Sequence, residues 1–282
     1  MELGGDPMRV EKAIHLSTLT LGDLRKMGAV DSILERFDWV HLGSEFCEQN
    51  FPADGDLLEL ADFFHQNGKG VCFLTPILSE RGLDRLEGFL ESVRGMAGGG
   101  RAAGRVEITV NDYGALQLIG NKKIAARINA GRLLQHDVFR LLPGKLFLQN
   151  RYILELFKSS GVGRFEISTT GALFETNLAD GERFGFDSSQ LSLSLYYPYM
   201  NLASTRACFL GMKSGSPRDS SGGFKCELEC RICGFEMDHH RVRNTFIIQG
   251  NTLFLRFPAK FYSSERELLE RRVDRLVYCP FP

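Results

Sequence analysis

The sequence predicts an α/β protein, a single TIM-barrel-like domain of mostly parallel strands with an irregular C-terminal part. Two features of the chain carry this prediction. Short apolar segments alternate with stretches of helical periodicity. The apolar segments contain few polar residues, as is typical of parallel strands that helices cover on both faces of the sheet. About eight such segments are spread over the 282 residues, a number that favours a closed barrel over an open sheet.

The expected strands follow one another along the chain, with helices between them. In the helix expected over 54–69, Gly68 suits the C-terminal end, and the apolar residues at helical spacing are Leu57, Leu58, Ala61 and Phe64. Ser79 is a suitable N-cap for the helix that follows the third strand. Strands are expected at 12–18, 39–44, 70–78, 105–116, 123–131, 164–169, 192–200 and 245–257.

One domain is expected over the whole of 1–282, because α/β barrels of this length form a single domain. No internal repeat is visible. Residues 1–11 are expected to be a flexible N-terminus. Residues 209–225 are expected to be a flexible loop, since "GMKSGSPRDSSGG" within them is rich in Gly and Ser. Residues 262–282 are expected to form a C-terminal helix and tail, because "SSERELLERRVDRLV" is amphipathic.

Charge and hydropathy exclude some classes of function and leave others open. The net charge of −1 provides no overall field that would attract nucleic acid or an anionic membrane. No apolar run approaches the length of a membrane span, and the N-terminus lacks the apolar core of a signal peptide. We therefore expect a cytoplasmic protein whose seven cysteines stay reduced and serve as ligands or as core residues.

Five of the cysteines occupy positions that suggest a metal centre. Cys226, Cys230 and Cys233 fall within eight residues, Cys47 lies just past the second expected strand, and Cys208 lies shortly after the seventh. In a parallel barrel the loops after the strands gather at one face, so these segments can meet there. Four converging thiolates would fit a [4Fe–4S] cluster. Cys72, inside a strand, and Cys279, in the tail, are interpreted as ordinary residues.

Three other interpretations of these cysteines remain open at this point. They could be free or buried thiols. They could bind zinc, with His239 or His240 as a further ligand, although only Cys230 and Cys233 have the C-x₂-C spacing that zinc sites usually show in pairs. The C-x₃-C-x₂-C spacing of Cys226, Cys230 and Cys233 is also that of radical-SAM enzymes, which carry it near the start of a barrel rather than late.

Seven short motifs occur in an order that resembles a known family. They are "VHLGSEFC", "NGKGVCFLTPIL", "VEITVNDYGAL", "INAGRLL", "YYPYMNLASTRACF", "CELEC" and "FIIQG". Between about residues 12 and 257 the chain resembles the collagenase-like, U-type peptidase family of unknown mechanism, and within it the UbiV-like branch. No G-x-S-x-G or H-E-x-x-H motif is present, so we do not expect an active protease.

The resemblance implies a barrel, a [4Fe–4S] cluster and a role in oxygen-independent hydroxylation with a related, UbiU-like partner chain. The substrate would be of the ubiquinone type or an RNA, with prephenate as the oxygen source. The ligands carried over by the resemblance are Cys47, Cys208, Cys226 and Cys230, with Cys233 as an extra cysteine. The alternative from another class is an accessory or electron-transfer subunit that carries the cluster and has no substrate site of its own.

Polar residues near the expected strand ends are candidates for contacting a substrate. Arg132 could bind a carboxylate through its two-pronged guanidinium, and a surface ion pair is the equal alternative. Asp112 could instead cap a helix, Glu45 could be a solvated loop charge, and His15 on the first strand could be a core histidine. The candidate substrate-binding residues are Glu45, Asn111, Asp112, Asn129 and Arg132.

Overall fold

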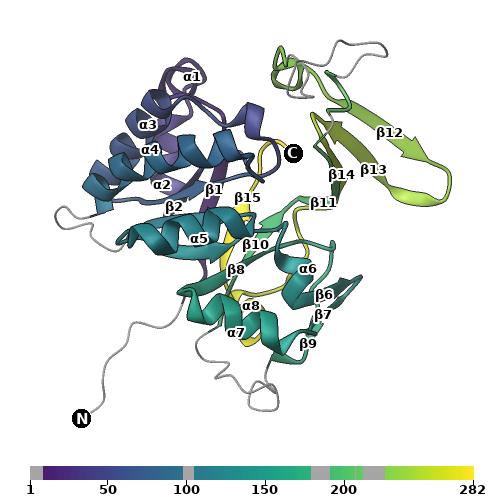
Figure 1. Ribbon diagram of the computed structural model, residues 1–282. Helices are drawn as coiled ribbons and strands as arrows, with labels where there is room; N and C mark the ends of the chain where they lie inside the picture. Colours follow the sequence, from purple (N-terminus) through teal and green to yellow (C-terminus); the bar gives the residue numbers. More distant parts are fainter. Residues whose placement is uncertain (1–8, 98–104, 179–190, 207, 212–225) are drawn as a thin grey trace.

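Eight parallel strands close into a barrel in the computed structural model, which describes residues 9–97, 105–178, 191–206, 208–211 and 226–282. The strands run around the barrel in the order β1, β15, β10, β8, β5, β4, β3, β2 (Figure 1). The TIM-barrel-like fold expected from the sequence is confirmed. The bounds are β1 (Glu11–Ser17), β2 (Trp39–Gly43), β3 (Gly70–Leu74), β4 (Val106–Val110), β5 (Arg127–Ala130), β8 (Val162–Ser168), β10 (Ser192–Tyr197) and β15 (Val273–Tyr278).

Helices surround the barrel and bury their apolar faces against it. In α3, the predicted apolar stripe is largely correct: Leu57, Ala61 and Phe64 are buried, and Leu60 completes the stripe in place of the half-buried Leu58. None of the helices in the described residues has the length and hydrophobicity to cross a membrane. The bounds are α1 (Leu21–Lys26), α2 (Val30–Arg36), α3 (Asp54–Gln66), α4 (Glu80–Ala97), α5 (Tyr113–Lys122), α6 (Gln135–Val138), α7 (Arg151–Ser159) and α8 (Glu265–Glu270).

Two small sheets lie outside the barrel (Figure 1). The larger is antiparallel and has the order β11 (Tyr199–Ser204), β14 (Thr252–Arg256), β13 (Val242–Gln249), β12 (Phe235–His239). The smaller consists of β6 (Phe139–Leu142), β7 (Lys145–Leu148) and β9 (Glu175–Thr176). Two single turns of 3₁₀ helix, η1 (Glu48–Asn50) and η5 (Glu229–Arg231), lie in the segments that carry the cysteines.

The eighth strand of the barrel differs from the prediction. Residues 245–257, expected as a barrel strand, form most of the β13–β14 hairpin in the antiparallel sheet. Residues 262–282, expected as a helix and tail, contain only the six-residue α8, and β15 then closes the barrel between β1 and β10. The charge on Arg275 suggests a helix surface, but its guanidinium is buried in the barrel against Glu107 and Glu11.

The expected flexible segments fall largely outside the described residues. Of 1–11, residues 1–8 are not described, and β1 already begins at Glu11. Of 209–225, residues 212–225 are not described, while 209–211 form a turn. In the described residues, the antiparallel sheet is attached to the barrel through β10 and β11, which follow each other directly in the sequence.

Candidate metal centre

Four cysteines from three distant segments gather beside the antiparallel sheet. Cys47 precedes η1, Cys208 follows β11, and Cys226 and Cys230 lie before and within η5. Burial raises the pKa of the Cys230 thiol to about 11, and negative charge on Cys47, Cys208 and Cys226 adds to that rise. Burial also raises the pKa of Cys47, with further contributions from Cys226 and Cys208. The four sulfurs are therefore close enough to interact electrostatically.

Backbone N–H groups point at three of these sulfurs. The N–H of Gly211 donates to Cys208 Sγ at 3.2 Å, and that of Leu228 donates to Cys226 Sγ at 3.4 Å. The N–H groups of Gln49 and Asn50 bond the Cys47 thiol and oppose the rise of its pKa. Donors of this kind favour a negatively charged sulfur, so the segments are arranged to hold thiolates once a cation compensates their mutual repulsion.

The turn between β13 and β14 joins the segments that carry the cysteines. The carbonyl of Gly250 accepts from Phe209 N at 2.9 Å. Asn251 donates from Nδ2 to Phe46 O and to Thr205 O, both at 2.6 Å. Sequence reasoning gave this turn no role, although a Gly-Asn pair between two apolar runs is a strong hairpin signal.

Gly250 also lies directly against a candidate ligand. Its φ is +60°, in the left-handed region that glycine tolerates best. A Cβ built on it would lie 3.3 Å from Cys230 Cβ and 3.5 Å from Cys230 Sγ. The absence of a side chain at this position therefore leaves room beside the sulfur.

The spacing of the sulfurs distinguishes between kinds of metal. In the described residues, no three of the four sulfurs lie within 4.8 Å of one another. Tetrahedral zinc with Zn–S bonds of about 2.3 Å would bring its four sulfurs to about 3.8 Å from one another. A four-iron cluster is wider than a single ion and keeps its thiolates farther apart.

The alternative ligands are placed differently. Cys233 is exposed, and its thiol donates to Glu229 O at 3.5 Å. Cys233 is not among the groups that mainly shift the pKa of Cys47 or of Cys230. His239 and His240 are exposed and lie against each other, with ring centroids 4.5 Å apart.

Two of the candidate substrate-binding residues form a buried ion pair next to the cysteine loop. Arg132 donates from Nε to Glu45 Oε1 at 2.9 Å and through a second nitrogen to Glu45 Oε2. Burial alone would lower the pKa of Arg132, but the Glu45 carboxylate outweighs this effect and raises it. Both alternatives, a solvated Glu45 and a surface pair of Arg132, are wrong, because the two side chains are only 1% and 2% exposed. The Arg132 guanidinium also covers the ring of Phe46, 5.0 Å from its centroid.

The other candidates hold the barrel together. Asn111 donates to Thr75 O at 2.9 Å and accepts from Leu133 N at 3.0 Å. Asp112 caps α5, as the alternative interpretation expected, by accepting from Ala115 N at 2.7 Å.

The remaining two polar residues singled out from the sequence, Asn129 and His15, lie inside the barrel. Asn129 donates to Glu107 Oε2 at 2.8 Å. His15 is buried, and burial lowers its pKa although Glu45 lies 3.9 Å away. Of the predicted polar residues, only Glu45 and Arg132 are thus brought together beside the cysteines.

Comparisons with known proteins identify only distant likenesses. No family model and no curated protein matches the chain. Solved structures that resemble it include a class V chitinase from Cycas revoluta (10% identity, 95% of this chain and 94% of that chain covered, TM-score 0.44). A family 18 N-acetylglucosaminidase from Paenibacillus barengoltzii (10% identity, 95% and 94%, TM-score 0.39) and the endoglucanase Cel5A from Thermobifida fusca (14% identity, 69% and 80%, TM-score 0.31) are others. At these values the likeness carries no argument about the activity of this chain.

Proposed function

We propose that the chain is an iron–sulfur protein that binds a [4Fe–4S] cluster through Cys47, Cys208, Cys226 and Cys230. The observation that supports this most directly is the gathering of four thiols from three segments, with backbone N–H donors on three of them. Such a cluster supplies one-electron redox chemistry when it is bound. The chain itself contributes the thiolates, the N–H donors and the space beside Gly250.

We further propose that the protein is a UbiV-like component of an oxygen-independent hydroxylation system. Four of the seven motifs that carry this resemblance, "VHLGSEFC", "YYPYMNLASTRACF", "CELEC" and "FIIQG", contain the four candidate cysteines or Gly250 beside Cys230, which supports the proposal. A ubiquinone-type molecule or an RNA is proposed as the substrate, with prephenate as the oxygen donor. The buried Glu45–Arg132 ion pair places polar groups on the barrel side of the four cysteines, which is consistent with a polar substrate there.

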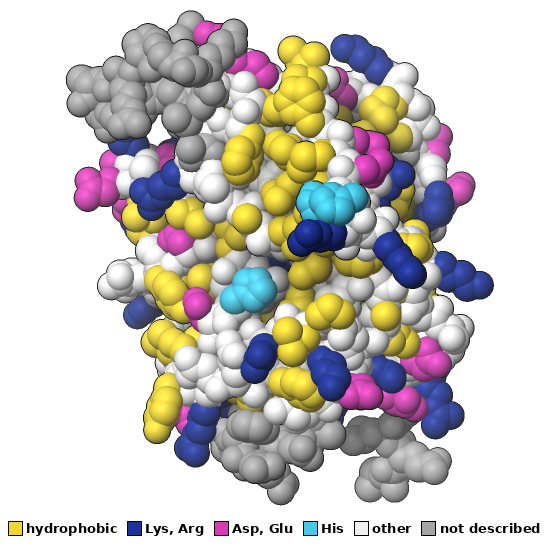
Figure 2. Space-filling model, turned by 90° about the vertical axis from the view of Figure 1, so that its right-hand side faces the viewer, with side chains coloured by type: hydrophobic (Ala, Val, Ile, Leu, Met, Phe, Trp, Pro, Cys, Tyr) yellow, Lys and Arg dark blue, Asp and Glu magenta, His cyan; other side chains and the backbone are white. Residues whose placement is uncertain are grey.

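A second candidate function is that of an accessory or electron-transfer subunit, and exposed hydrophobic side chains favour it. Phe209, next to Cys208, is 52% exposed, and Ile232, between Cys230 and Cys233, is 89% exposed. Phe235 and Met237 on β12 are exposed as well. Figure 2 shows hydrophobic side chains spread over one side of the molecule. Hydrophobic surface of this kind beside a redox centre suits contact with a redox partner protein.

The cluster assignment is tested by comparing alanine variants of Cys47, a proposed ligand, and Cys233, which is not one. After anaerobic reconstitution, wild type should hold about four irons per chain and show the visible absorbance of a cluster. Cys47→Ala should lose most of both, whereas Cys233→Ala, the matched control, should retain them. Loss of iron with Cys233→Ala but not with Cys47→Ala would support the radical-SAM interpretation instead. Stoichiometric zinc in place of iron would contradict both the four-cysteine cluster and the radical-SAM cluster.

The hydroxylation role is tested separately in cells. Cells that lack this chain and grow without oxygen should lose hydroxylated quinone or hydroxylated RNA, and the wild-type chain but not Cys47→Ala should restore it. If both kinds of product persist while an iron-loaded chain co-purifies with a redox partner, the accessory role replaces the hydroxylation role.

A further inference from the structure

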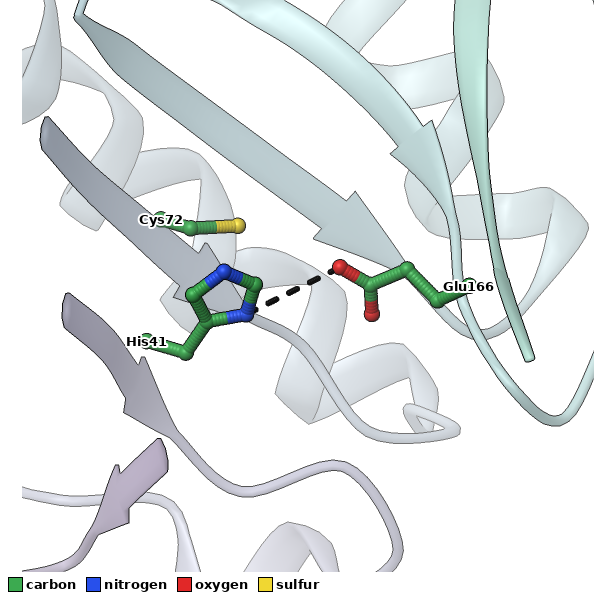
Figure 3. Close-up of side chains that lie close together, drawn as sticks. All are labelled: His41, Cys72 and Glu166. Carbon is green, nitrogen blue, oxygen red and sulfur yellow. Dashed lines mark ion pairs between the residues drawn. The ribbon is translucent and has the colours of Figure 1, made fainter. Parts of the chain in front are cut away.

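A second group of metal-ligating side chains lies inside the barrel and is separate from the four-cysteine centre. His41 on β2, Cys72 on β3 and Glu166 on β8 each offer a ligand atom, and the three atoms lie within 4.8 Å of one another. Figure 3 shows the three side chains pointing toward one another from different strands. All three are fully buried. Cys72, which looks like an ordinary strand residue in the sequence, is one of the three.

One ring nitrogen of His41 has no partner. The Tyr196 hydroxyl donates its only proton to Glu166 Oε2 at 2.7 Å, so its oxygen accepts from His41 Nδ1, also at 2.7 Å. With Glu166 ionised, as a metal ligand must be, the proton of the neutral ring is on Nδ1, and Nε2 carries a lone pair. Nε2 is buried without any hydrogen-bond partner. A buried imidazole whose other nitrogen is held by a hydrogen bond is the usual state of a histidine that ligates a metal.

The carboxylate of Glu166 lacks the Arg partner that the nearby carboxylates have. His41 Nδ1 lies 3.8 Å from its Oε1 (dashed line in Figure 3), but burial lowers the pKa of this imidazole well below its usual value, so the ring is neutral. The carboxylate accepts hydrogen bonds from two neutral hydroxyls, those of Tyr196 and, at 2.9 Å, Thr109. No Lys or Arg nitrogen of the described residues lies within 4.0 Å of it, whereas Glu107 pairs with Arg275. Each carboxylate oxygen has two lone pairs, so both hydrogen bonds leave capacity for a metal.

The barrel contains the same three residue types a second time, which provides an internal comparison. Cys279 Sγ lies 4.0 Å from His15 Nδ1, and Glu45 lies 3.9 Å from the same nitrogen. There, however, Arg132 neutralises Glu45, and His15 Nε2 lies 3.4 Å from Gly43 O. Only the group around His41 combines an unpartnered nitrogen with a carboxylate that has no cation.

We propose that His41, Cys72 and Glu166 bind one divalent transition metal ion of the zinc class. An imidazole, a thiolate and a carboxylate form a ligand set that suits such an ion, and three protein ligands leave a fourth position open. The thiol proton of Cys72, and the proton that burial favours on the Glu166 carboxyl, leave to solvent when the metal binds. Asn129 Nδ2 lies 3.7 Å from the Cys72 sulfur as a donor that stabilises the thiolate. This proposal does not depend on the iron–sulfur cluster.

Cobalt(II) is the probe that tests the proposal, because a thiolate bound to it gives a charge-transfer band in the near ultraviolet. The full chain carrying Cys226→Ala and Cys230→Ala, which removes two candidate cluster ligands, is titrated with cobalt and then passed through a desalting column. One cobalt per chain with the band is expected. Cys72→Ser in this background should abolish the band, while Cys279→Ser, the matched buried cysteine, should retain it.

Glu166→Gln is a second test variant that should still fold, because glutamine has the same size as glutamate. With unchanged circular dichroism, it should bind cobalt at least about tenfold more weakly. Metal analysis of the iron-loaded wild type provides a second readout and should find one zinc per chain in addition to the iron. The proposal is overturned if cobalt gives no thiolate band, or if Cys279→Ser abolishes the band while Cys72→Ser leaves it intact.

Discussion

The side chain of Asn251 donates a hydrogen bond of 2.6 Å to the backbone carbonyl of Phe46, the residue before Cys47. The same amide donates to Thr205 O, three residues before Cys208. One side chain in the β13–β14 turn thus holds the approaches to two candidate ligands that come from different parts of the sequence. The antiparallel sheet, rather than the barrel alone, therefore positions the segments that carry the candidate ligands.

Replacing Asn251 by alanine should loosen both loops, because two carbonyls lose their donor. We expect a loss of about 1–3 kcal/mol in the free energy of unfolding and faster release of iron from the reconstituted protein. Iron release to a chelator measures the second effect. Asn244→Ala removes an exposed bond to Arg256 O in the same hairpin and should leave iron release unchanged. Equal iron release in the two variants would contradict this role of Asn251.

Replacing Gly250 by alanine should affect the metal centre beyond its cost to the backbone. The left-handed φ alone should cost about 1–2 kcal/mol, and the new methyl group would contact the Cys230 side chain. Gly144→Ala is the matched control, since its φ is +67° and the nearest atom to its Cβ is a carbonyl oxygen at 4.0 Å. Both variants should melt earlier, but only Gly250→Ala should show reduced iron content and altered visible absorbance.

Breaking the buried pair of Glu45 and Arg132 should destabilise the barrel strongly. Arg132→Met leaves a buried carboxylate without its cation, which costs about 3–5 kcal/mol. The double variant with Glu45→Gln should recover much of this loss, because no uncompensated charge remains. Urea unfolding of the two single variants and the double variant measures the coupling between the residues. If the double variant lost as much unfolding free energy as the two single variants together, the two residues would not be energetically coupled.

Acid should weaken the structure through Asp38. Burial would raise the pKa of this carboxyl, but hydrogen bonds from Lys12 N at 2.9 Å and from the Arg9 guanidinium at 2.7 Å lower it. A depressed folded-state pKa means that its stabilisation is present above the unfolded-state pKa of about 3.9 and is lost as the pH falls through the folded-state pKa.

Asp38→Asn tests this pH dependence. The variant should be less stable than wild type at pH 7, and the difference should shrink as the pH falls below about 4. Urea unfolding at a series of pH values measures it. A difference that stays constant down to acidic pH would show that the stabilisation by Asp38 is independent of its charge.

Local patterns in the sequence determined much of the fold. Seven of the eight barrel strands overlap segments that the sequence predicted, because buried parallel strands need continuous apolar runs and helices need apolar residues at helical spacing. The interpretation of Asp112 as a helix cap depends on equally local chemistry, since its side chain bonds a backbone N–H three residues away. The cysteine cluster at 226–233 was likewise visible in the sequence as a potential metal site.

Contacts between distant residues decided the rest. β15 closes the barrel because Arg275 is neutralised there by Glu107 and Glu11, two carboxylates from other strands. Whether Cys47 lies near Cys230, and whether Glu45 meets Arg132, likewise depends on segments that fold together from far apart. A charge or a thiol has the same appearance in a sequence whether it ends in water or in the core. Only the tertiary structure decides which partner removes the energetic cost of burying it.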